Sequence, residues 1–445
     1  MPYDTAIPNL LTSLKAKYGN EMPTQIAIVR DIFGKICCLL PANSKRDLDE
    51  LTSSVKAGLA EYAAEPAVIN LNSSISRKIL LEPSLWRVET LPDLTEITVQ
   101  TVDRRIVGQD WLLPPPSTGL SSPRIVFSSL KGGVGRSTAL AVAASHLAQR
   151  GRNILVIDFD LEAPGLGSML LNQDNRPNYG TLDFLVENGR RSFNDEDLDE
   201  FVGTSELTDR TAGQGIVDVV PATGRLCMRF PQNVLSKLAR AVLEDPKPDG
   251  STETLRQQTR SFVDRMSSRR RYDAVFIDAR AGLAELTAAP LLGLNATVLM
   301  FGVDQPQTFE GFAYLLAHLA QLPINDGSDW RYNLRFVQSK ASANPADRES
   351  FINSLYDTLS EHFYEADTDP SQLEVGDKMR FNFSMSDNQA PHHPFFIGFD
   401  GRYLNFDPIR DRSFLSEDLY KAAYEPFLKN LEQLVGIKDD NPVFG

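Results

Sequence analysis

A glycine-rich octet, Lys131–Thr138, has the residue types and spacing that bind phosphate groups. It reads Lys-Gly-Gly-Val-Gly-Arg-Ser-Thr, follows the apolar run Ile125–Phe127, and precedes a helical pattern over residues 139–149. Glycines let the backbone curl so that several N–H groups point at one anion, and a helix N-terminus adds its positive dipole end. The octet therefore predicts a phosphate-binding loop between a strand and a helix.

Two later segments place aspartates at the ends of apolar strands. Ile154–Asp160 reads Ile-Leu-Val-Ile-Asp-Phe-Asp, and Tyr272–Asp278 reads Tyr-Asp-Ala-Val-Phe-Ile-Asp. Side chains alternate along a strand, so Asp158 and Asp160 are expected to project the same way if the extended backbone continues. Ligands of open parallel sheets bind at the carboxyl ends of the strands. The octet and these aspartates are therefore expected at one edge of a sheet.

The three motifs, in this order, resemble those of the ParA/MinD family of ATPases, whose phosphate loop is a deviant Walker A motif. The resemblance covers about residues 124 to 437, with gaps at two insertions, and implies that the ligands are ATP and Mg²⁺. The nucleotide-binding residues that it implies are Gly132, Gly133, Val134, Gly135, Arg136, Ser137, Thr138 and Gly282.

The resemblance also implies roles for single residues. Lys131 matches the lysine that reaches across a nucleotide-sandwich dimer to the phosphates held by the partner subunit. Asp160 matches the residue that positions the attacking water, so Lys131 and Asp160 are the catalytic candidates. Ser137 and the Walker B residue Asp278 are the candidate Mg²⁺ ligands, Asp278 through a water because Mg²⁺ sheds its hydration shell reluctantly.

Two arginines depart from the family pattern. Arg136 stands in place of the second lysine of the loop; it keeps the charge, but its planar fork is not a compact ammonium. Nucleotide binding is expected to survive this change, whereas the rate of hydrolysis is left open. Arg280 replaces a neutral residue. The sequence does not decide whether it contacts phosphate, a neighbouring subunit or a surface carboxylate.

The resulting expectation is an ATP-binding, Mg²⁺-dependent switch protein and slow ATPase that forms a homodimer around nucleotide and recruits or regulates a protein partner. The alternative is a nucleotide-stabilised scaffold with little or no hydrolysis. A bacterial tyrosine kinase ranks lower, because no tyrosine follows Tyr424. The sequence does not separate partitioning, positioning and defence roles, or ATP from GTP.

Composition narrows the class of protein. The chain has 445 residues, which suggests two domains, and a net charge of −14, which makes DNA a less favoured partner. Its three cysteines, Cys37, Cys38 and Cys227, have neither metal-site nor disulfide spacing, and Cys37 and Cys38 look like apolar strand residues. There is no signal peptide pattern and no apolar run long enough for a membrane span. A cytoplasmic location is expected.

The expected fold class is α/β: a P-loop NTPase with a parallel sheet covered by helices on both faces, preceded by a smaller α+β domain. The boundary is placed after a Pro-rich linker, giving residues 1–120 as the regulatory or partner-binding domain and 121–445 as the ATPase domain. Insertions are expected near 172–215 and 225–270. The expected strands of the larger domain are Ile125–Phe127, Ile154–Ile157, Val217–Val220, Ala274–Ile277 and Thr297–Phe301, with Leu334–Val337 and Phe381–Phe383 as weaker candidates.

Three further segments receive structural interpretations. The pair His392-His393 lacks a partner at ligand spacing and is assigned to a loop. The run Arg269–Arg271 is assigned to a solvated helix end rather than to a DNA contact. The helix expected over Leu415–Val435 has mixed charges, which favours packing against the sheet over membrane binding.

Overall fold

The protein consists of two compact units, Met1–Leu113 and Pro114–Gly445. The computed structural model describes residues 2–18, 27–40, 48–70, 87–91, 94–105, 107–117, 122–190, 193–208, 212–246, 252–324, 329–366 and 380–436. Within these ranges, no helix is long and apolar enough to cross a membrane.

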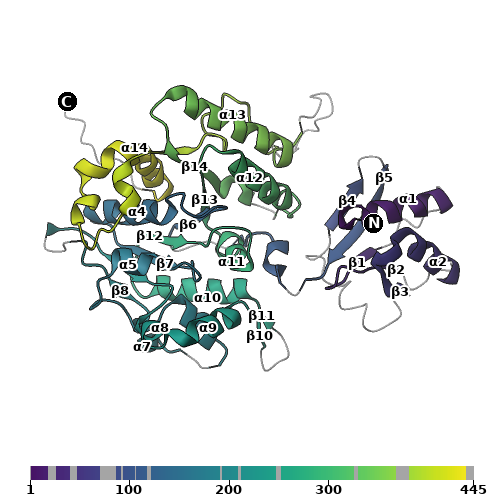
Figure 1. Ribbon diagram of the computed structural model, residues 1–445, viewed down its shortest axis with the longest axis horizontal. Helices are drawn as coiled ribbons and strands as arrows, with labels where there is room; N and C mark the ends of the chain where they lie inside the picture. The colour runs from purple at the N-terminus through teal and green to yellow at the C-terminus, as the bar shows by residue number, and fades with distance from the viewer. Residues whose placement is uncertain are drawn as a thin grey trace. The chain divides into compact units, whose positions relative to one another are not determined.

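The first unit is a five-stranded mixed sheet with two helices on one face (Figure 1). Its strands are β1 (Ala27–Arg30), β2 (Ile36–Leu40), β3 (Ala63–Asn70), β4 (Arg87–Leu91) and β5 (Leu94–Asp103), and its helices are α1 (Ala6–Tyr18) and α2 (Leu48–Leu59). The strand order is β3-β2-β1-β5-β4, and β1 and β2 form the predicted hairpin, with Gly34 at φ 81° in its turn. Cys37 and Cys38 are both buried in β2, as the sequence predicted.

The second unit is built on an eight-stranded sheet in which neighbouring strands pair in parallel, except that β8 is antiparallel to β9. The strands are β6 (Arg124–Ser129), β7 (Ile154–Asp158), β8 (Gly203–Thr204), β9 (Val217–Val220), β12 (Ala274–Asp278), β13 (Thr297–Gly302), β14 (Leu334–Ala341) and β15 (Phe395–Gly398). Their order is β15-β14-β13-β6-β12-β7-β9-β8, which places β6 and its glycine-rich loop beside β12, whose end carries Asp278. The predicted fold class is confirmed.

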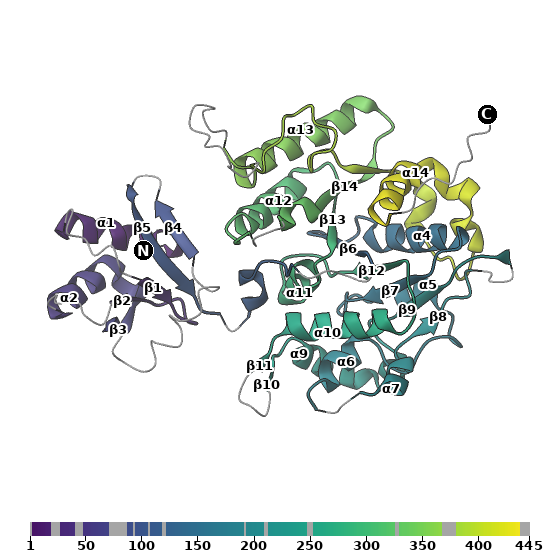
Figure 2. The same cartoon turned by 180° about the vertical axis from the view of Figure 1, so that it is seen from behind.

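Helices cover both faces of this sheet because its central strands are apolar on both sides (Figures 1 and 2). The helices are α4 (Arg136–Gln149), α5 (Leu166–Leu170), α6 (Thr181–Glu187), α7 (Asp195–Asp199), α8 (Arg225–Arg229), α9 (Val234–Ala241), α10 (Leu255–Ser268), α11 (Glu285–Gly293), α12 (Pro306–Leu319), α13 (Pro345–His362) and α14 (Glu417–Leu434). One core joins the sheet to α4, α5 and α14, and in it Phe427 of α14 contacts Phe127 and Phe301. This confirms the predicted packing of the C-terminal helix.

The two expected insertions carry helices and short strands. Residues 172–215 contribute α6, α7 and the edge strand β8, and residues 225–270 contribute α8, α9, α10 and the two-stranded ribbon of β10 (Asp245–Pro246) and β11 (Thr252–Glu253). The rings of Phe184 and Phe262 stack with centroids 4.2 Å apart, which joins α6 to α10. Arg269 forms an ion pair with Asp199, and Arg270 forms one with Asp218. The expectation that these two arginines are simply solvated is therefore wrong.

One predicted strand is wrong, and strand β15 (Phe395–Gly398) was not predicted. Phe381–Phe383 is not a strand; instead, the Phe381 and Phe383 rings pack against each other and around Tyr332 and Tyr364. The strand beside β14 is β15, just after His392-His393, and the sequence analysis missed it. His392 lies in a loop, fully buried, with its ring nitrogens 2.8 Å from the Tyr364 hydroxyl and 3.2 Å from the Met385 carbonyl.

Candidate functional site

The glycine-rich octet forms an open loop between β6 and α4. Gly133 and Gly135 have φ values of 75° and 88°, a left-handed backbone that favours glycine. A Cβ added at Gly132, Gly133 or Gly135 would meet no atom within 4 Å, so these glycines do not serve close packing inside the protein. The first turn of α4 directly follows, and its N–H groups lack helical partners. The loop therefore leaves space and donors for an anion.

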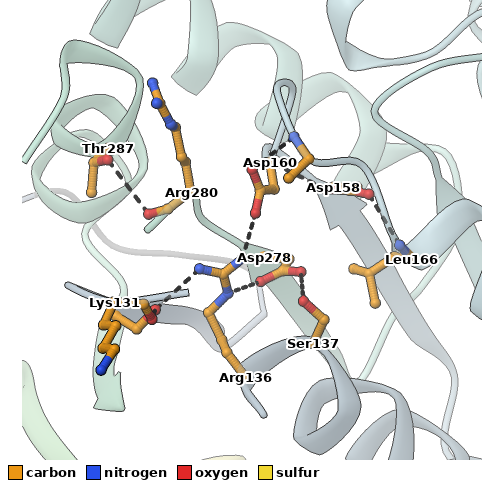
Figure 3. Close-up of polar contacts among 11 residues, drawn as sticks. Lys131, Arg136, Ser137, Asp158, Asp160, Leu166, Asp278, Arg280 and Thr287 are labelled. Carbon is orange, nitrogen blue, oxygen red and sulfur yellow. Dashed lines mark hydrogen bonds and ion pairs between the residues drawn. The ribbon is translucent and has the colours of Figure 1, made fainter. Parts of the chain in front are cut away.

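Arg136, the first residue of α4, turns inward and bridges three side chains (Figure 3). Its Nη2 donates to a carboxylate oxygen of Asp160 at 2.7 Å, its Nη1 to the Ser129 hydroxyl at 3.3 Å, and its Nε to Asp278. The arginine is only 7% exposed. Burial by itself lowers its pKa, but the charges of Asp278 and Asp160 outweigh this and raise the pKa of Arg136. The guanidinium thus stays charged inside the protein.

Asp278 and Ser137 form the polar pair next to this arginine. The Ser137 hydroxyl donates to the second carboxylate oxygen of Asp278 at 2.6 Å. Burial raises the pKa of Asp278, and the contacts with Arg136 and Ser137 act in the opposite direction. The two residues come from different elements, the start of α4 and the end of β12, and are brought together because β6 and β12 are hydrogen-bonded neighbours.

Asp158 and Asp160 have different hydrogen-bond partners and different roles in the local structure. β7 ends at Asp158, so the alternation of an extended strand does not reach Asp160. The Asp158 carboxylate accepts the backbone N–H groups of Asp160 at 3.0 Å and Leu166 at 3.2 Å, and so fixes both ends of the loop that follows β7 (Figure 3). Asp160 pairs with Arg136 and also accepts the Ala163 N–H at 3.3 Å. Burial, then the charge of Asp278, raises the pKa of Asp158.

Lys131 and Gly282 border a cavity of about 430 Å³ that also reaches Phe301 and Tyr314. The Lys131 side chain extends away from the carboxylates, and its Nζ donates to Gln305 at 3.1 Å (Figure 3). A second cavity of about 390 Å³ borders Lys131–Val134 on the side of β13 and β14. Both volumes fall within the range of small-molecule pockets.

Lys340 holds the glycine-rich loop from the neighbouring strand β14. Its Nζ donates to the Gly133 carbonyl at 2.8 Å, and its backbone has φ 53°. Near it, the buried Gln338 Oε1 and Ser339 Oγ have no hydrogen-bond partner within the described part of the chain. Buried polar atoms are rarely left unpaired, so these two oxygens fit a site that a polar ligand completes.

The loops after β7 and β12 are joined by an ion pair. Arg280 Nη1 lies 2.6 Å from a carboxylate oxygen of Glu162, and both side chains are partly exposed. This contact favours the surface-carboxylate alternative for Arg280. Gly282, at φ 97°, donates its N–H to the Ser129 carbonyl at 2.9 Å, which anchors the second loop against the end of β6.

The donors present fit Mg²⁺ bound together with a nucleotide. Ser137 and Asp278 offer hard oxygen atoms, which Mg²⁺ prefers. No group of three or more His, Cys, Asp or Glu side chains that could hold a metal was found among the described residues. Two protein ligands are enough for Mg²⁺, because this ion usually keeps several of its waters and completes its coordination with substrate phosphates.

The structure thus brings Arg136, Ser137, Asp160 and Asp278 into contact, whereas the Lys131 side chain points elsewhere. Gly132, Gly133, Val134, Gly135 and Thr138 lie along the loop and the first turn of α4, and Gly282 and Val134 both line the cavity of about 430 Å³. Sequence reasoning missed Ser129 and Lys340. Ser129 ends β6 and Lys340 lies near the end of β14, so the strand-end position was the available signal.

A family model described as the CobQ/CobB/MinD/ParA nucleotide binding domain matches residues 125–362, more than half of the chain. A segment of 64 residues is 38% identical to the septum site-determining protein MinD of Helicobacter pylori; it makes up 14% of this chain and 24% of that relative. The chain thus matches about a quarter of the length of this curated relative.

Two solved structures resemble the chain at low sequence identity. A ParA family ATPase from Chlorobium tepidum TLS has 15% identity and a TM-score of 0.44, with 71% of this chain and 99% of that chain covered. The MinD cell division protein of Aquifex aeolicus has 15% identity and a TM-score of 0.41, with 70% and 97% covered.

Proposed function

The chain belongs to the CobQ/CobB/MinD/ParA nucleotide-binding family, and from this membership we propose that it is an ATP-binding, Mg²⁺-dependent switch ATPase. The observation that supports this most directly is the glycine-rich loop: its glycines face open space, it leads into α4, and it lies beside the Ser137–Asp278 pair. The backbone N–H groups of the loop and of the first turn of α4 would hold the phosphates.

Ser137 and Asp278 would hold the metal, and Thr138 would donate to a phosphate oxygen. Bound Mg²⁺ would neutralise charge on the phosphates and help to orient them. Asp160 would position the attacking water, since phosphoryl transfer depends mainly on placement and charge stabilisation. Asp160 and Asp278 both contact Arg136, so the arginine would compete with the water and the metal for these carboxylates.

We also propose that two copies form a dimer around nucleotide. The exposed Lys131, which points away from its own carboxylates, would serve the phosphates bound by the second copy. The first unit, which contains none of the phosphate-binding motifs, would select a protein partner. DNA is less favoured because the net charge is −14.

Calorimetric titration of the full chain with Mg-ATP and Mg-GTP tests the proposal. Heat of binding is expected with Mg-ATP. Ser137→Ala should weaken ATP binding much more when Mg²⁺ is present than when a chelator has removed it. Ser168→Ala, which removes an exposed serine hydroxyl of α5, is the matched control. Absence of heat with either nucleotide, from folded protein, would refute the proposal.

A nucleotide-stabilised scaffold with little hydrolysis is the second candidate. It is favoured by one observation, the ion pair that ties the water-positioning candidate Asp160 to Arg136. Phosphate release by the wild type and by Arg136→Lys separates the two functions. A switch ATPase turns over measurably as the protein concentration rises and dimers form, whereas a scaffold stays inactive at every concentration.

A further inference from the structure

The guanidinium of Arg136 lies among the buried carboxylates of the site. It contacts Asp160 and Asp278 together, and the side chains of these two residues are 12% and 2% exposed. Asp158, fully buried, lies close enough for the charges of both to raise its pKa. Buried carboxylates repel one another and lose hydration, so a cation beside this cluster stabilises its charged form.

A lysine could not make the same set of contacts. The three nitrogens of Arg136 reach Asp278, Ser129 and Asp160 in three directions, whereas an ammonium group is a single point at the end of its chain. Arginine in place of the family's lysine therefore gives this position a separate nitrogen donor for each of Asp278, Ser129 and Asp160.

The same position is unfavourable for a divalent cation bound to the protein alone. One oxygen of Asp278 accepts from Arg136 and the other from Ser137, so each carboxylate oxygen already has one hydrogen-bond donor beside it. A metal ion next to Ser137 and Asp278 would also stand beside the guanidinium, at close range and in a poorly solvated site, where like charges repel strongly.

We propose that Arg136 is a positioning residue that bridges Asp160 and Asp278 and competes with divalent cations for these carboxylates until phosphates draw it away. Phosphate groups offer the guanidinium another anionic partner; once it moves to them, Asp278 and Asp160 become available. Metal and nucleotide then bind with positive coupling, each raising the affinity of the other. The exclusion of metal stands on the contacts above, and only its release by phosphates rests on the proposed function.

Manganese binding to the full chain, measured by electron paramagnetic resonance without nucleotide, tests the exclusion. Mn²⁺ is a spectroscopic substitute for Mg²⁺ at oxygen ligands. Wild type should bind Mn²⁺ alone at least tenfold more weakly than Arg136→Met, and Asp278→Asn in the Arg136→Met background should abolish the gain. Arg280→Met, which breaks the nearby pair with Glu162 but leaves Asp160 and Asp278 untouched, should bind as wild type does.

Two further measurements keep the test decisive if Arg136→Met folds poorly. Arg136→Lys keeps the charge and should show intermediate Mn²⁺ affinity, and wild type should bind Mn²⁺ at least tenfold more tightly when a non-hydrolysable ATP analogue is present. Equal Mn²⁺ affinity of wild type and both variants without nucleotide would overturn the proposal. If wild type binds no nucleotide but Arg136→Met gains metal binding, the proposed function fails and the exclusion of metal by Arg136 stands.

Discussion

Replacing Arg136 by methionine should destabilise the larger unit by about 3–5 kcal/mol, the usual cost of removing one partner from a buried ion pair. The substitution keeps a long, unbranched side chain but leaves the buried carboxylates of Asp160 and Asp278 without their cation. If one of them must then stay protonated at pH 7, the cost is about 1.36 kcal/mol for each of roughly three pH units above its ordinary pKa of 3.9, about 4 kcal/mol. The two estimates agree.

Urea denaturation followed by circular dichroism at neutral pH measures this loss in the transition assigned to residues 114–445. Asp278→Asn in the Arg136→Met background removes one of the two buried carboxylates that have lost their cation. It should recover about half of the lost free energy of unfolding. Arg280→Met breaks a partly exposed ion pair and should cost less than about 1 kcal/mol. A loss below about 1 kcal/mol for Arg136→Met would show that the buried bridge does not stabilise the fold, and the reasoning would be wrong.

Three other outcomes are expected. Asp160→Ala removes the candidate that positions water, so nucleotide binding should persist and ATP should trap a dimer; equal dimerisation with ADP and ATP, by size-exclusion chromatography, would argue against that role. Lys131→Ala should weaken ATP-dependent association, seen by light scattering, far more than nucleotide binding by each subunit, and unchanged association would exclude a role in the second copy's site. Burial, then the charges of Asp278 and Asp160, raises the pKa of Asp158, so its contribution to stability is present at low pH and is lost as the pH rises from about 3.8 to about 8. Asp158→Asn, which carries no charge at any pH, should therefore lose less unfolding free energy than wild type between about pH 5 and about pH 8 in urea titrations; an equal loss would contradict the raised pKa.

Much of the fold was open to prediction because its strands are short, apolar and followed by polar loops. β6, β7, β9, β12 and β13 lie where the sequence placed them, and each is buried on both faces. β8 has two residues and its position at the sheet edge depends on pairing with β9, so no local pattern reveals it. Phe381–Phe383 has the composition of a strand, but its rings pack into an aromatic cluster instead.

The amino-acid sequence by itself determined the chemical inventory of the candidate site. The glycines of the octet, the hydroxyl of Ser137 and the carboxylates of Asp160 and Asp278 follow from local order: strand, then loop, then helix. The backbone conformation of such a loop depends on residues that are neighbours in the chain, so the pattern carries the information.

Only the tertiary structure decided which of these groups contact one another. Lys340 reaches the carbonyl of Gly133 across 207 positions in the chain, and Arg136 reaches Asp278 across 142. Such contacts depend on the order of the strands in the sheet and on which charges are buried together. A local sequence pattern predicts neither of these. The fold places Arg136, at the start of α4, between the buried carboxylates of Asp160 and Asp278, because burying those charges without a cation beside them would cost more free energy.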